Sequence, residues 1–383
     1  MSRWPQKKLF EIAQVMMGQS PPGETYNARG EGLPFFQGKA EFGDVYPTPG
    51  KWCSEPLKIA EPGDILLSVR APVGPTNIVH VKSCIGRGLA AIRANQGLIL
   101  PSLLLYFFKA YEQSIAQLGV GSTFNAIGKD DIGNLEIPVP PLSHQEQIVG
   151  ILNESDHLRR LRAEAVRRTA DLVPAFYYEM FGDPATNPKG WPISRAGDLM
   201  ICCDYGSSER PNDESKGTPI IRMNNVTSDG NLDISDLKYV QTDHLDKYRL
   251  QAGDVLFNRT NSRELVGKTG LWDGRFEAVP ASYFIRVRFD SQKEHPQHFT
   301  TFMNLPLMKR RLFEMARSAI GQANINMKEL QSIEIPVPPI TLQIAFAALV
   351  VEIRAFEAAQ TASRRRLDDL FQSLLHCAFH GEL

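Results

Sequence analysis

The sequence predicts an α+β protein with two β-rich domains that contain short helices and are separated by a long antiparallel two-helix coiled coil. Two observations predict this class. The sequence repeats itself at an interval of about 198 residues, and each copy ends in a long run with helical periodicity. We therefore expect a domain over 1–141, a helix over 142–182, a second domain over 183–339 and a second helix over 340–383, related by a pseudo-twofold internal repeat.

The repeat is clearest in a proline-rich element that closes each β-rich segment. Residues 135–141 read Leu-Glu-Ile-Pro-Val-Pro-Pro, and residues 333–339 read Ile-Glu-Ile-Pro-Val-Pro-Pro, an offset of 198 from 141 to 339. Residues 62–66 (Pro-Gly-Asp-Ile-Leu) recur at 252–256 (Ala-Gly-Asp-Val-Leu). The offset varies by a few residues between elements, as insertions in loops would produce.

Each copy has the same internal order of short apolar runs followed by a helical stretch. The runs at 64–70, 89–93, 254–259 and 283–288 predict strands, because they are rich in apolar residues and bounded by Gly, Pro or Asn. Residues 101–118 and about 296–319 predict helices. The proline-rich element then marks a boundary, since proline continues neither a helix interior nor a strand ladder.

Two long helices are predicted after these boundaries, each of about 35 residues and about 50 Å. Ser143, with Glu146 three residues later, suggests a capping box, and Thr341 is the corresponding candidate cap. Gly182 and Gly381 are placed to end the helices. A helix of this length with one apolar stripe needs a partner, and its repeat mate is the obvious one.

Pro174 lies inside the first of these helical patterns. A proline in a helix interior removes one hydrogen bond and clashes with the preceding turn. We therefore expect the first long helix to bend or split near residues 170–173.

The composition is that of a globular protein, with 43% hydrophobic and 22% charged residues. The net charge of −1 is not that of a protein that coats DNA nonspecifically, so positive charge for DNA must be arranged locally. The five cysteines form no Cys-x-x-Cys pair, which argues against a zinc site and against a disulfide framework. Without an apolar run of about 18 to 20 residues, a cytoplasmic protein with no membrane contact is expected.

The motifs of common enzymes are missing, which favours a non-catalytic protein without a metal site. An adenine methyltransferase needs an Asn/Asp-Pro-Pro-aromatic loop, and the Pro-Pro pairs here follow Val-Pro. Residues 267–269 (Gly-Lys-Thr) approach a P-loop, but Ser262 stands where its first glycine is required. An enzyme with an unrecognised site is the alternative that this reasoning leaves open.

Three further segments carry a resemblance to a known family. Residues 181–184 (Phe-Gly-Asp-Pro) with 187–191 (Asn-Pro-Lys-Gly-Trp), residues 142–148 after the proline-rich element, and residues 378–383 (Ala-Phe-His-Gly-Glu-Leu) resemble the specificity subunits of type I restriction-modification systems. The resemblance covers essentially the whole chain. Each piece alone is weak, but the duplicated set in this order is highly specific.

The resemblance implies two target-recognition domains that each read one half of a bipartite, asymmetric site in double-stranded DNA. It implies helices that set the unread spacer and dock two N6-adenine methyltransferase subunits, which bind S-adenosylmethionine, so that the chain itself needs no cofactor. An endonuclease form would add two restriction subunits, which bind ATP and Mg²⁺. An orphan DNA-binding or scaffold protein of the same fold, without a restriction partner, is the alternative.

Candidate DNA contacts are polar residues in loops beside the predicted strands, because Arg and Lys match guanine edges and Asn and Gln match adenine edges. A solvated turn or an internal ion pair is the competing interpretation for each candidate. In the first domain the candidates are Gln37, Lys39, Ser68, Arg70, Arg87, Ser122 and Asn125. Arg87 is a candidate because its flanking glycines could let the backbone approach phosphate. In the second domain they are Arg222, Asn224, Asn225, Asn258, Arg259, Asn261, Ser262, Arg263, Asn324 and Asn326.

Residues of the two long helices are candidates for docking the methyltransferase subunits. For the basic residues, a solvated helix face and phosphate contact over the spacer are the competing interpretations, and for the aromatic ones it is core packing. The candidates are Arg159, Arg160, Arg167, Phe176, Tyr177, Arg364 and Arg365.

Overall fold

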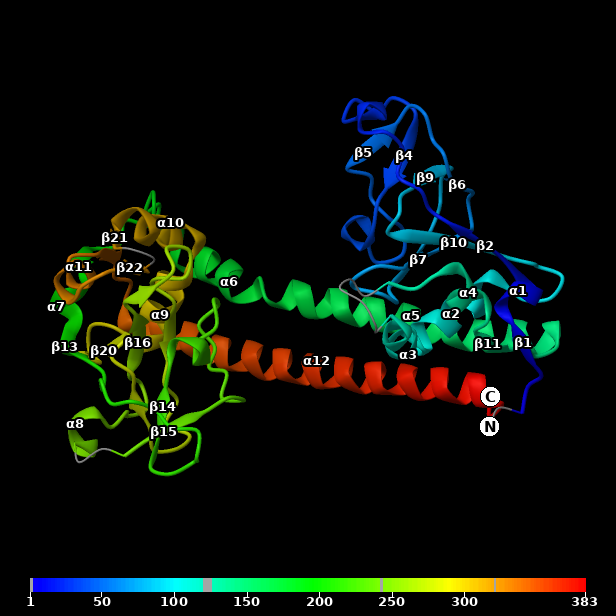
Figure 1. Ribbon diagram of the computed structural model, residues 1–383. Helices are drawn as coiled ribbons and strands as arrows, with labels where there is room; N and C mark the ends of the chain where they lie inside the picture. Colours follow the sequence, from blue (N-terminus) through cyan, green and yellow to red (C-terminus); the bar gives the residue numbers. More distant parts are fainter. Residues whose placement is uncertain (1–2, 120–125, 242–243, 320–321) are drawn as a thin grey trace. The chain divides into compact units, whose positions relative to one another are not determined.

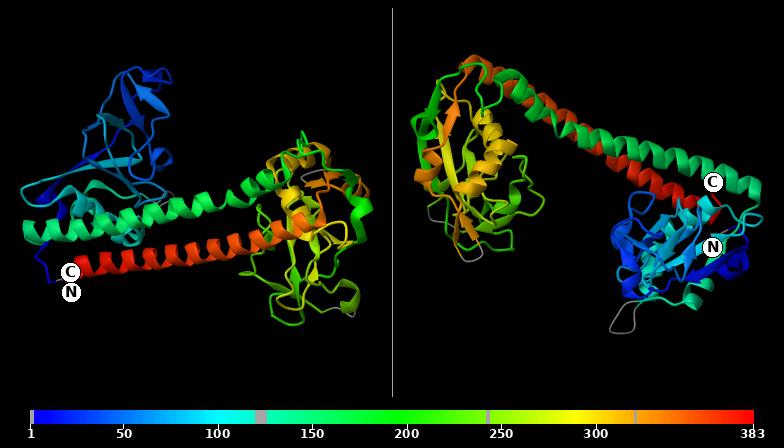
Figure 2. Two further views of the ribbon diagram at one scale, coloured as in Figure 1. Left: turned by 180° about the vertical axis from the view of Figure 1, so that it is seen from behind. Right: turned by 90° about the horizontal axis from the view of Figure 1, so that it is seen from above.

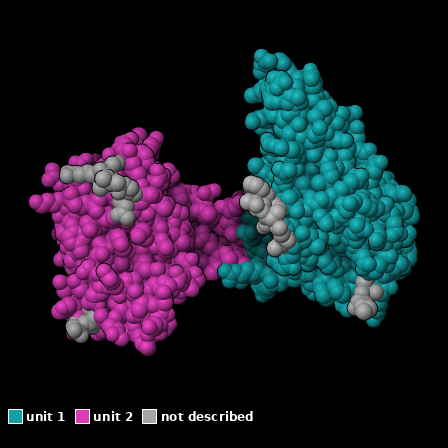
Figure 3. Space-filling view, in the orientation of Figure 1, with its two compact units in different colours: residues 1–164, 362–383 teal, residues 165–361 magenta. Residues whose placement is uncertain are grey.

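The computed structural model describes residues 3–119, 126–241, 244–319 and 322–383 and is a mixture of helices and sheets (Figure 1). It divides into two compact units, coloured separately in Figure 3. Unit 1 contains Met1–Glu164 and Ala362–Leu383, and unit 2 contains Ala165–Thr361. Both units therefore combine a β-rich segment with parts of long helices.

The centre of unit 1 is an antiparallel sheet in the order β2-β10-β7-β8. Its strands are β2 (Ala13–Met17), β7 (Ile65–Ser68), β8 (Thr76–Ile78) and β10 (Leu89–Ala94). A five-stranded sheet in the order β3-β5-β4-β9-β6 adjoins it, with β3 (Tyr26–Asn27), β4 (Leu33–Phe36), β5 (Lys51–Cys53), β6 (Ile59–Ala60) and β9 (Ser83–Ile85). A two-stranded sheet joins β1 (Gln6–Lys8) to β11 (Glu136–Pro138), so the proline-rich element begins as a strand.

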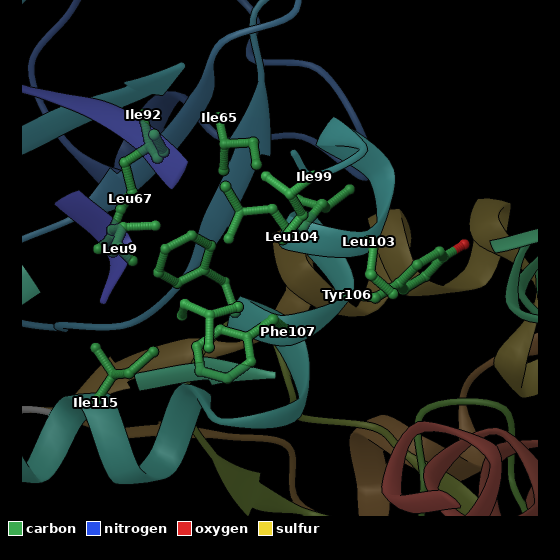
Figure 4. Close-up of a cluster of buried hydrophobic side chains, with 14 of the residues drawn as sticks. Leu9, Ile65, Leu67, Ile92, Ile99, Leu103, Leu104, Tyr106, Phe107 and Ile115 are labelled. Carbon is green, nitrogen blue, oxygen red and sulfur yellow. The ribbon is translucent and has the colours of Figure 1, made fainter. Parts of the chain in front are cut away.

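The helices of unit 1 cover one face of the central sheet. They are α1 (Leu9–Ile12), α2 (Pro101–Ala110), α3 (Glu112–Leu118), α4 (Lys129–Gly133) and the first part of α5 (Leu142–Thr169). The 3-10 turns η1 (Gly23–Thr25) and η2 (Lys39–Glu41) lie in the segment that contains β3, β4 and β5. Ile65 and Leu67 of β7 pack with Leu104 of α2 in the main core (Figure 4), whereas Leu66 faces a second, smaller cluster. Burial on both faces explains why this strand reads as a continuous apolar run rather than an alternating one.

Unit 2 has a central antiparallel sheet with the corresponding order, β13-β20-β16-β18. Its strands are β13 (Met200–Tyr205), β16 (Val255–Asn258), β18 (Thr269–Leu271) and β20 (Phe284–Phe289). Smaller sheets contain β14 (Thr218–Ile221), β15 (Lys238–Val240) and β19 (Val279–Pro280); β17 (Thr260–Asn261), β21 (Arg317–Ala319) and β22 (Gln322–Asn324); and β12 (Ile193–Arg195) with β23 (Glu334–Pro336).

The helices of unit 2 are α6 (Leu172–Phe181), α7 (Ala196–Leu199), α8 (Leu245–Tyr248), α9 (Pro296–Asn304), α10 (Pro306–Met315), α11 (Met327–Gln331) and part of α12 (Ile340–His380), with the 3-10 turn η3 (Met223–Asn225). Pro296 and Pro306 begin their helices, where a missing N–H removes no helical hydrogen bond. The sequence predicted one helix to residue 319, but α10 ends at Met315 and β21 follows. That part of the prediction is wrong, because the chain turns there to form the β21–β22 pair.

A buried ion pair recurs in both units at the turn before the central strand. Asp64 is 2% exposed, and its carboxylate accepts hydrogen bonds from the Glu61 N–H and from the Arg93 guanidinium at 2.8 Å. Asp254 is 1% exposed and accepts from the Gln251 N–H and from Arg288. The preceding glycines, Gly63 and Gly253, both have φ of +92°, which explains the Gly-Asp pattern in the sequence.

A buried glutamine, rather than the predicted capping residue, anchors the start of each long helix. Helices α5 and α12 begin at Leu142 and Ile340, so Ser143 and Thr341 lie in the first turn and the capping prediction is wrong. The Gln145 amide donates to the carbonyls of Leu98 and Pro140, and its oxygen accepts from the Leu100 N–H at 2.8 Å. Gln343 makes the corresponding bonds to Lys293, Pro338 and His295. These bonds tie each helix start to the loop before α2 or α9.

The chain breaks its helix where Pro174 predicts, since α5 ends at Thr169 and α6 begins at Leu172. Helix α12 is unbroken over its 41 residues (Figure 2). Gly182 and Gly381, with φ of +84° and +78°, follow the ends of α6 and α12 as expected. In unit 1 the first described residue lies beside the last turn of α12, because the Arg3 N–H donates to the His380 carbonyl at 3.2 Å.

Among the described residues, no helix has the length and apolar character needed to span a bilayer.

Candidate nucleic-acid interface

Strand β17, the residues on either side of it and the end of β22 bring together five of the predicted DNA-contacting residues of unit 2. Strand β17 pairs with β22, and the Ile325 N–H donates to the Arg259 carbonyl at 2.9 Å, so the loop is fixed against the end of β22. The predicted residues gathered here are Arg259, Asn261, Ser262, Arg263 and Asn324. Four of these residues were predicted in one segment, and the fold adds Asn324 from a separate segment; together they form a region here called the β17 loop region.

Arg259 is held by an aromatic ring and a backbone carbonyl. Its guanidinium carbon lies 4.7 Å from the centre of the Tyr205 ring, and its Nε donates to the Ser282 carbonyl at 3.1 Å. Tyr205 ends β13 and is 41% exposed. The guanidinium is therefore positioned at a surface rather than buried in the core.

Arg263 is held in the same way by α10. Its guanidinium carbon lies 4.3 Å from the centre of the Phe313 ring, and its Nε donates to the Phe313 carbonyl at 3.1 Å. Phe313 is 39% exposed. Sequence reasoning missed Tyr205 and Phe313, because nothing in their local sequence marks them and their roles depend on packing against residues far along the chain.

The amides of this region serve mainly the protein's own structure. The Asn324 Nδ2 donates to the Thr260 hydroxyl at 2.8 Å, and the Asn261 oxygen accepts from the Ser262 N–H. Asn326 caps α11 by accepting from the Glu329 N–H, so a direct DNA contact by this residue is not supported. Ser262 is exposed.

The segment 222–225 is a structural turn with one exposed residue. The Asn225 side chain is 2% exposed and donates to the carbonyls of Asp233 and Asp236. The Arg222 Nη2 is bonded to the carbonyl and carboxylate of Asp236, both at 2.9 Å. Asn224 alone is exposed. A direct DNA contact is therefore not supported for Asn225, and Arg222 has its charge paired within the protein.

In unit 1 the fold brings Gln37 and Arg87 together. The N–H groups of Gly86 and Gly88 donate to the Phe36 and Gln37 carbonyls at 2.8 and 3.1 Å. A Cβ on Gly88 would lie 2.3 Å from the Gln37 oxygen, so this glycine serves the approach of two protein loops rather than an approach to phosphate. Gln37 and Arg87 are exposed.

Of the remaining candidates in unit 1, Lys39 in η2 and Arg70 after β7 are also exposed. Ser122 and Asn125 lie outside the described residues. Ser68 is 2% exposed, and its hydroxyl donates to the carbonyls of Arg70 and Pro72. Asn258 in unit 2 is fully buried. Direct contact with DNA is not supported for Ser68 and Asn258, because both side chains lie inside the protein.

The hydrogen-bond pattern shows which residues of the two units correspond. In unit 1 the Val69 N–H donates to the Gly88 carbonyl, and the Val69 carbonyl accepts from Ile127. In unit 2 the Arg259 N–H donates to the Tyr283 carbonyl, and its carbonyl accepts from Ile325. The position of Arg259 is therefore occupied in unit 1 by Val69, which is 2% exposed, and not by Arg70.

Three of the helix arginines predicted to dock partners lie beside carboxylates of the protein, and two are exposed. Arg159 of α5 bonds Asp368 of α12 at 2.8 Å and lies 4.3 Å from the centre of the Phe371 ring, so it joins the two helices inside unit 1. Arg160 pairs with Asp156, and Arg364 lies 3.8 Å from Asp368. Arg167 and Arg365 are exposed.

The aromatic candidates belong to the core of unit 2. Tyr177 is 1% exposed, and its hydroxyl lies 3.1 Å from the His298 Nε2, while the His298 Nδ1 lies 2.7 Å from Glu294. Burial, followed by the nearby Glu294 carboxylate, raises the pKa of Tyr177 well above its usual value. Phe176 is half-buried against the same core. Docking of a partner by Tyr177 is therefore not supported, because its side chain is enclosed.

A family model for the type I restriction modification DNA specificity domain matches residues 1–165 and 188–348. The chain belongs to this family. Specificity subunits of type I restriction-modification systems are non-catalytic DNA-recognition proteins, and no group of three or more potential metal ligands occurs among the residues that the structure describes.

Two curated specificity subunits are similar to this one. The putative type I restriction enzyme MjaX specificity subunit of Methanocaldococcus jannaschii is 46% identical over 156 residues, which cover 41% of this chain and 36% of that protein. The type I restriction enzyme EcoKI specificity subunit of Escherichia coli K12 is 25% identical over 379 residues, covering 90% of this chain and 80% of that protein. The match of higher identity over a short stretch and the match of lower identity over most of the chain support the same family.

Solved structures support the fold of this specificity subunit. A chain solved in work on complex assembly and conformational transition of the type I R-M system has a TM-score of 0.65 at 21% identity, covering 99% of this chain and 98% of that one. The S subunit from M. genitalium has a TM-score of 0.60 at 14% identity and covers 99% and 96%.

Proposed function

We propose that this specificity subunit reads a bipartite, asymmetric DNA site, with residues 1–141 as one target-recognition domain and residues 183–339 as the other. The observation that supports this proposal is that the position directly after corresponding central strands is occupied by different residues, Val69 in unit 1 and Arg259 in unit 2. Sequence is read by side chains at base edges, so domains with the same scaffold but different loops read different half-sites.

The proposed contacts are the exposed polar residues near the ends of the central strands. Those of the first domain are Gln37, Lys39, Arg70 and Arg87, and those of the second are Asn224, Ser262 and Arg263, together with the half-buried Arg259 and Asn261. The near-zero net charge fits this arrangement, because affinity then depends on a few placed cations rather than on a broad basic surface.

The helical segments 142–182 and 340–383 are proposed to form an antiparallel coiled coil that sets the spacer between the half-sites. Within unit 1, the Arg159–Asp368 pair supports a contact between α5 and α12. Helix α12 has 41 residues. At 1.5 Å per residue it is about 60 Å long, enough for half-sites between one and two turns of DNA apart, with a turn of about 34 Å.

The chemistry is proposed to reside in two N6-adenine methyltransferase subunits that bind S-adenosylmethionine and dock on these helices. Arg167 and Arg365 are exposed cations suited to acidic partner residues, and Ile151, Leu158 and Leu161 of α5 are exposed apolar residues. A mixture of exposed apolar and charged groups is typical of an interaction surface. Two restriction subunits would complete the endonuclease.

The test is co-expression of this chain with the methyltransferase of its own system in a host that lacks other adenine methylation, followed by methylation mapping across the genome. The expected result is one bipartite motif with two different halves and a fixed spacer. A continuous motif, or methylation when the specificity chain is expressed alone, would contradict the proposal.

A further inference from the structure

The β17 loop region contains two arginines that are held by the same arrangement. Arg259 and Arg263 each stack on an exposed aromatic ring, Tyr205 or Phe313, and each donates its Nε to a backbone carbonyl at 3.1 Å. A cation over a ring face is attracted by the ring quadrupole, and the Nε bond fixes rotation of the guanidinium plane. Two guanidinium groups four residues apart are thus both oriented before any ligand binds.

Three other arginines of unit 2 use their terminal nitrogens within the protein. Arg286 bonds the Asp204 carboxylate and the carbonyls of Arg249 and Lys247, and Arg288 bonds Asp254. The Arg222 Nη2 bonds Asp236. For Arg259 and Arg263, by contrast, no hydrogen-bond partner of the Nη atoms is found among the described residues, although the exposed Glu264 carboxylate interacts electrostatically with Arg263.

The free Nη atoms define what these side chains can bind. A guanidinium has five N–H donors, and with Nε occupied the two Nη groups remain as an end-on fork with four donors and no acceptor. Such a fork matches the O6 and N7 acceptors of guanine in the major groove, whereas adenine presents a donor at the corresponding place. Orienting the fork in advance reduces the entropy lost on binding.

We propose that Tyr205 and Phe313 are positioning residues that orient Arg259 and Arg263 to read guanine in the second half-site. The inference rests on the proposed function and specifies which base is read. The half-site read by residues 183–339 contains at least one G·C pair that these two guanidinium groups recognise. Val69 occupies the corresponding position in unit 1, so the first half-site is read without this arrangement.

A phosphate clamp is the competing use of the same side chains, and it makes a different prediction. Phosphate binding contributes equally to all sequences and is lost with rising salt, whereas base reading separates G·C from A·T at one position. The guanidinium is held against an aromatic ring rather than left free to rotate on its side chain. This favours base reading, because discrimination between bases needs donors in fixed positions.

The experiment uses the complete complex with the methyltransferase, after the methylated motif has been mapped. Binding is measured on duplexes in which single G·C pairs of either half-site are replaced by A·T. Arg259→Ala is expected to reduce discrimination at one G·C pair of the second half-site by roughly 5- to 100-fold, the range for a bidentate base contact. Discrimination in the first half-site should be unchanged.

The aromatic variants test the positioning role itself. Tyr205→Phe keeps the ring and should behave as the parent, whereas Tyr205→Leu should reduce discrimination at the same pair by about 2- to 10-fold, in line with the strength of a cation–π contact. Phe313→Tyr and Phe313→Leu should behave in the same way at the pair read by Arg263. Thermal unfolding of each variant confirms that unit 2 remains folded.

Arg310→Ala is the matched control, because Arg310 is an exposed cation on the same helix as Phe313. It should weaken binding equally on all duplexes and leave discrimination unchanged. The inference is overturned if the mapped second half-site has no G·C pair, or if Tyr205→Leu discriminates like the parent. It is also overturned if Arg259→Ala weakens all duplexes equally. These results leave a bipartite motif intact, whereas loss of the bipartite motif in the parent complex would contradict the proposed function instead.

Discussion

The buried aspartates that begin the central strands give a quantitative prediction for each unit. In Asp254→Ala, Arg288 loses its carboxylate partner and the Gln251 N–H loses its acceptor. The Arg288 side chain is 26% exposed, so water replaces the carboxylate only in part. Removing one partner of a buried pair typically costs about 3–5 kcal/mol, and we expect unit 2 to lose about 4 kcal/mol of unfolding free energy.

Asp64→Ala is the matched variant in unit 1. Arg93 is 48% exposed there, so its guanidinium regains more water, and we expect a smaller loss of about 2–3 kcal/mol. Urea unfolding followed by hydrogen exchange of peptides from each unit measures the two losses separately. Losses under about 1 kcal/mol for both variants, or a larger loss for Asp64→Ala, would refute the reasoning from burial.

Three further predictions concern stability and assembly. Burial lowers the pKa of Lys309 to about 7, with a smaller contribution from Lys268. The folded form thus binds fewer protons than the unfolded form above pH 7, and stability rises from pH 7 towards the ordinary lysine pKa. Lys309→Met should flatten this rise and stabilise unit 2 near pH 7 by about 2 kcal/mol, because the desolvation penalty outweighs two lost hydrogen bonds. Unfolding curves between pH 6 and 10 measure the free energy of unfolding of the variant and the parent. A variant whose stability rises with pH as steeply as that of the parent would contradict the prediction. Gln343→Leu should destabilise unit 2 by about 3 kcal/mol, since it leaves the His295 N–H and two carbonyls without partners; a loss below about 1 kcal/mol in urea unfolding would show that water replaces them. Arg365→Glu should weaken methyltransferase binding about tenfold at low salt without changing the motif, with Lys51→Glu, an exposed lysine of β5, as a control outside the long helices; an unchanged dissociation constant in titration calorimetry would remove Arg365 from the docking surface.

The sequence predicted strands and helices where local pattern and burial agree. The runs at 64–70 and 254–259 were recognised because β7 and β16 are apolar on both faces. Helix ends were predicted less well. The capping residues were wrong because α5 and α12 start at the residue after the proline-rich element and are anchored by Gln145 and Gln343, whose partners lie about 45 residues earlier.

The candidate site was predictable in composition but not in geometry. Loops rich in Arg and Asn were identified correctly as polar. However, Ser68, Asn225 and Asn258 turned out to be buried, because backbone groups near strand ends also need partners. The roles of Tyr205 and Phe313 could not be predicted, since each ring meets its arginine about 50 residues away along the chain. Only tertiary packing determines which polar side chains remain available for DNA.

The claim that each domain reads its own half-site is tested most directly by a chimaera that carries residues 1–141 in both domain positions, each followed by its own long helix. Methylation mapping with the partner methyltransferase should then give a palindromic motif, in which the first half-site appears twice in opposite orientations across the spacer. Retention of the original second half-site by the folded, assembled chimaera would contradict the account.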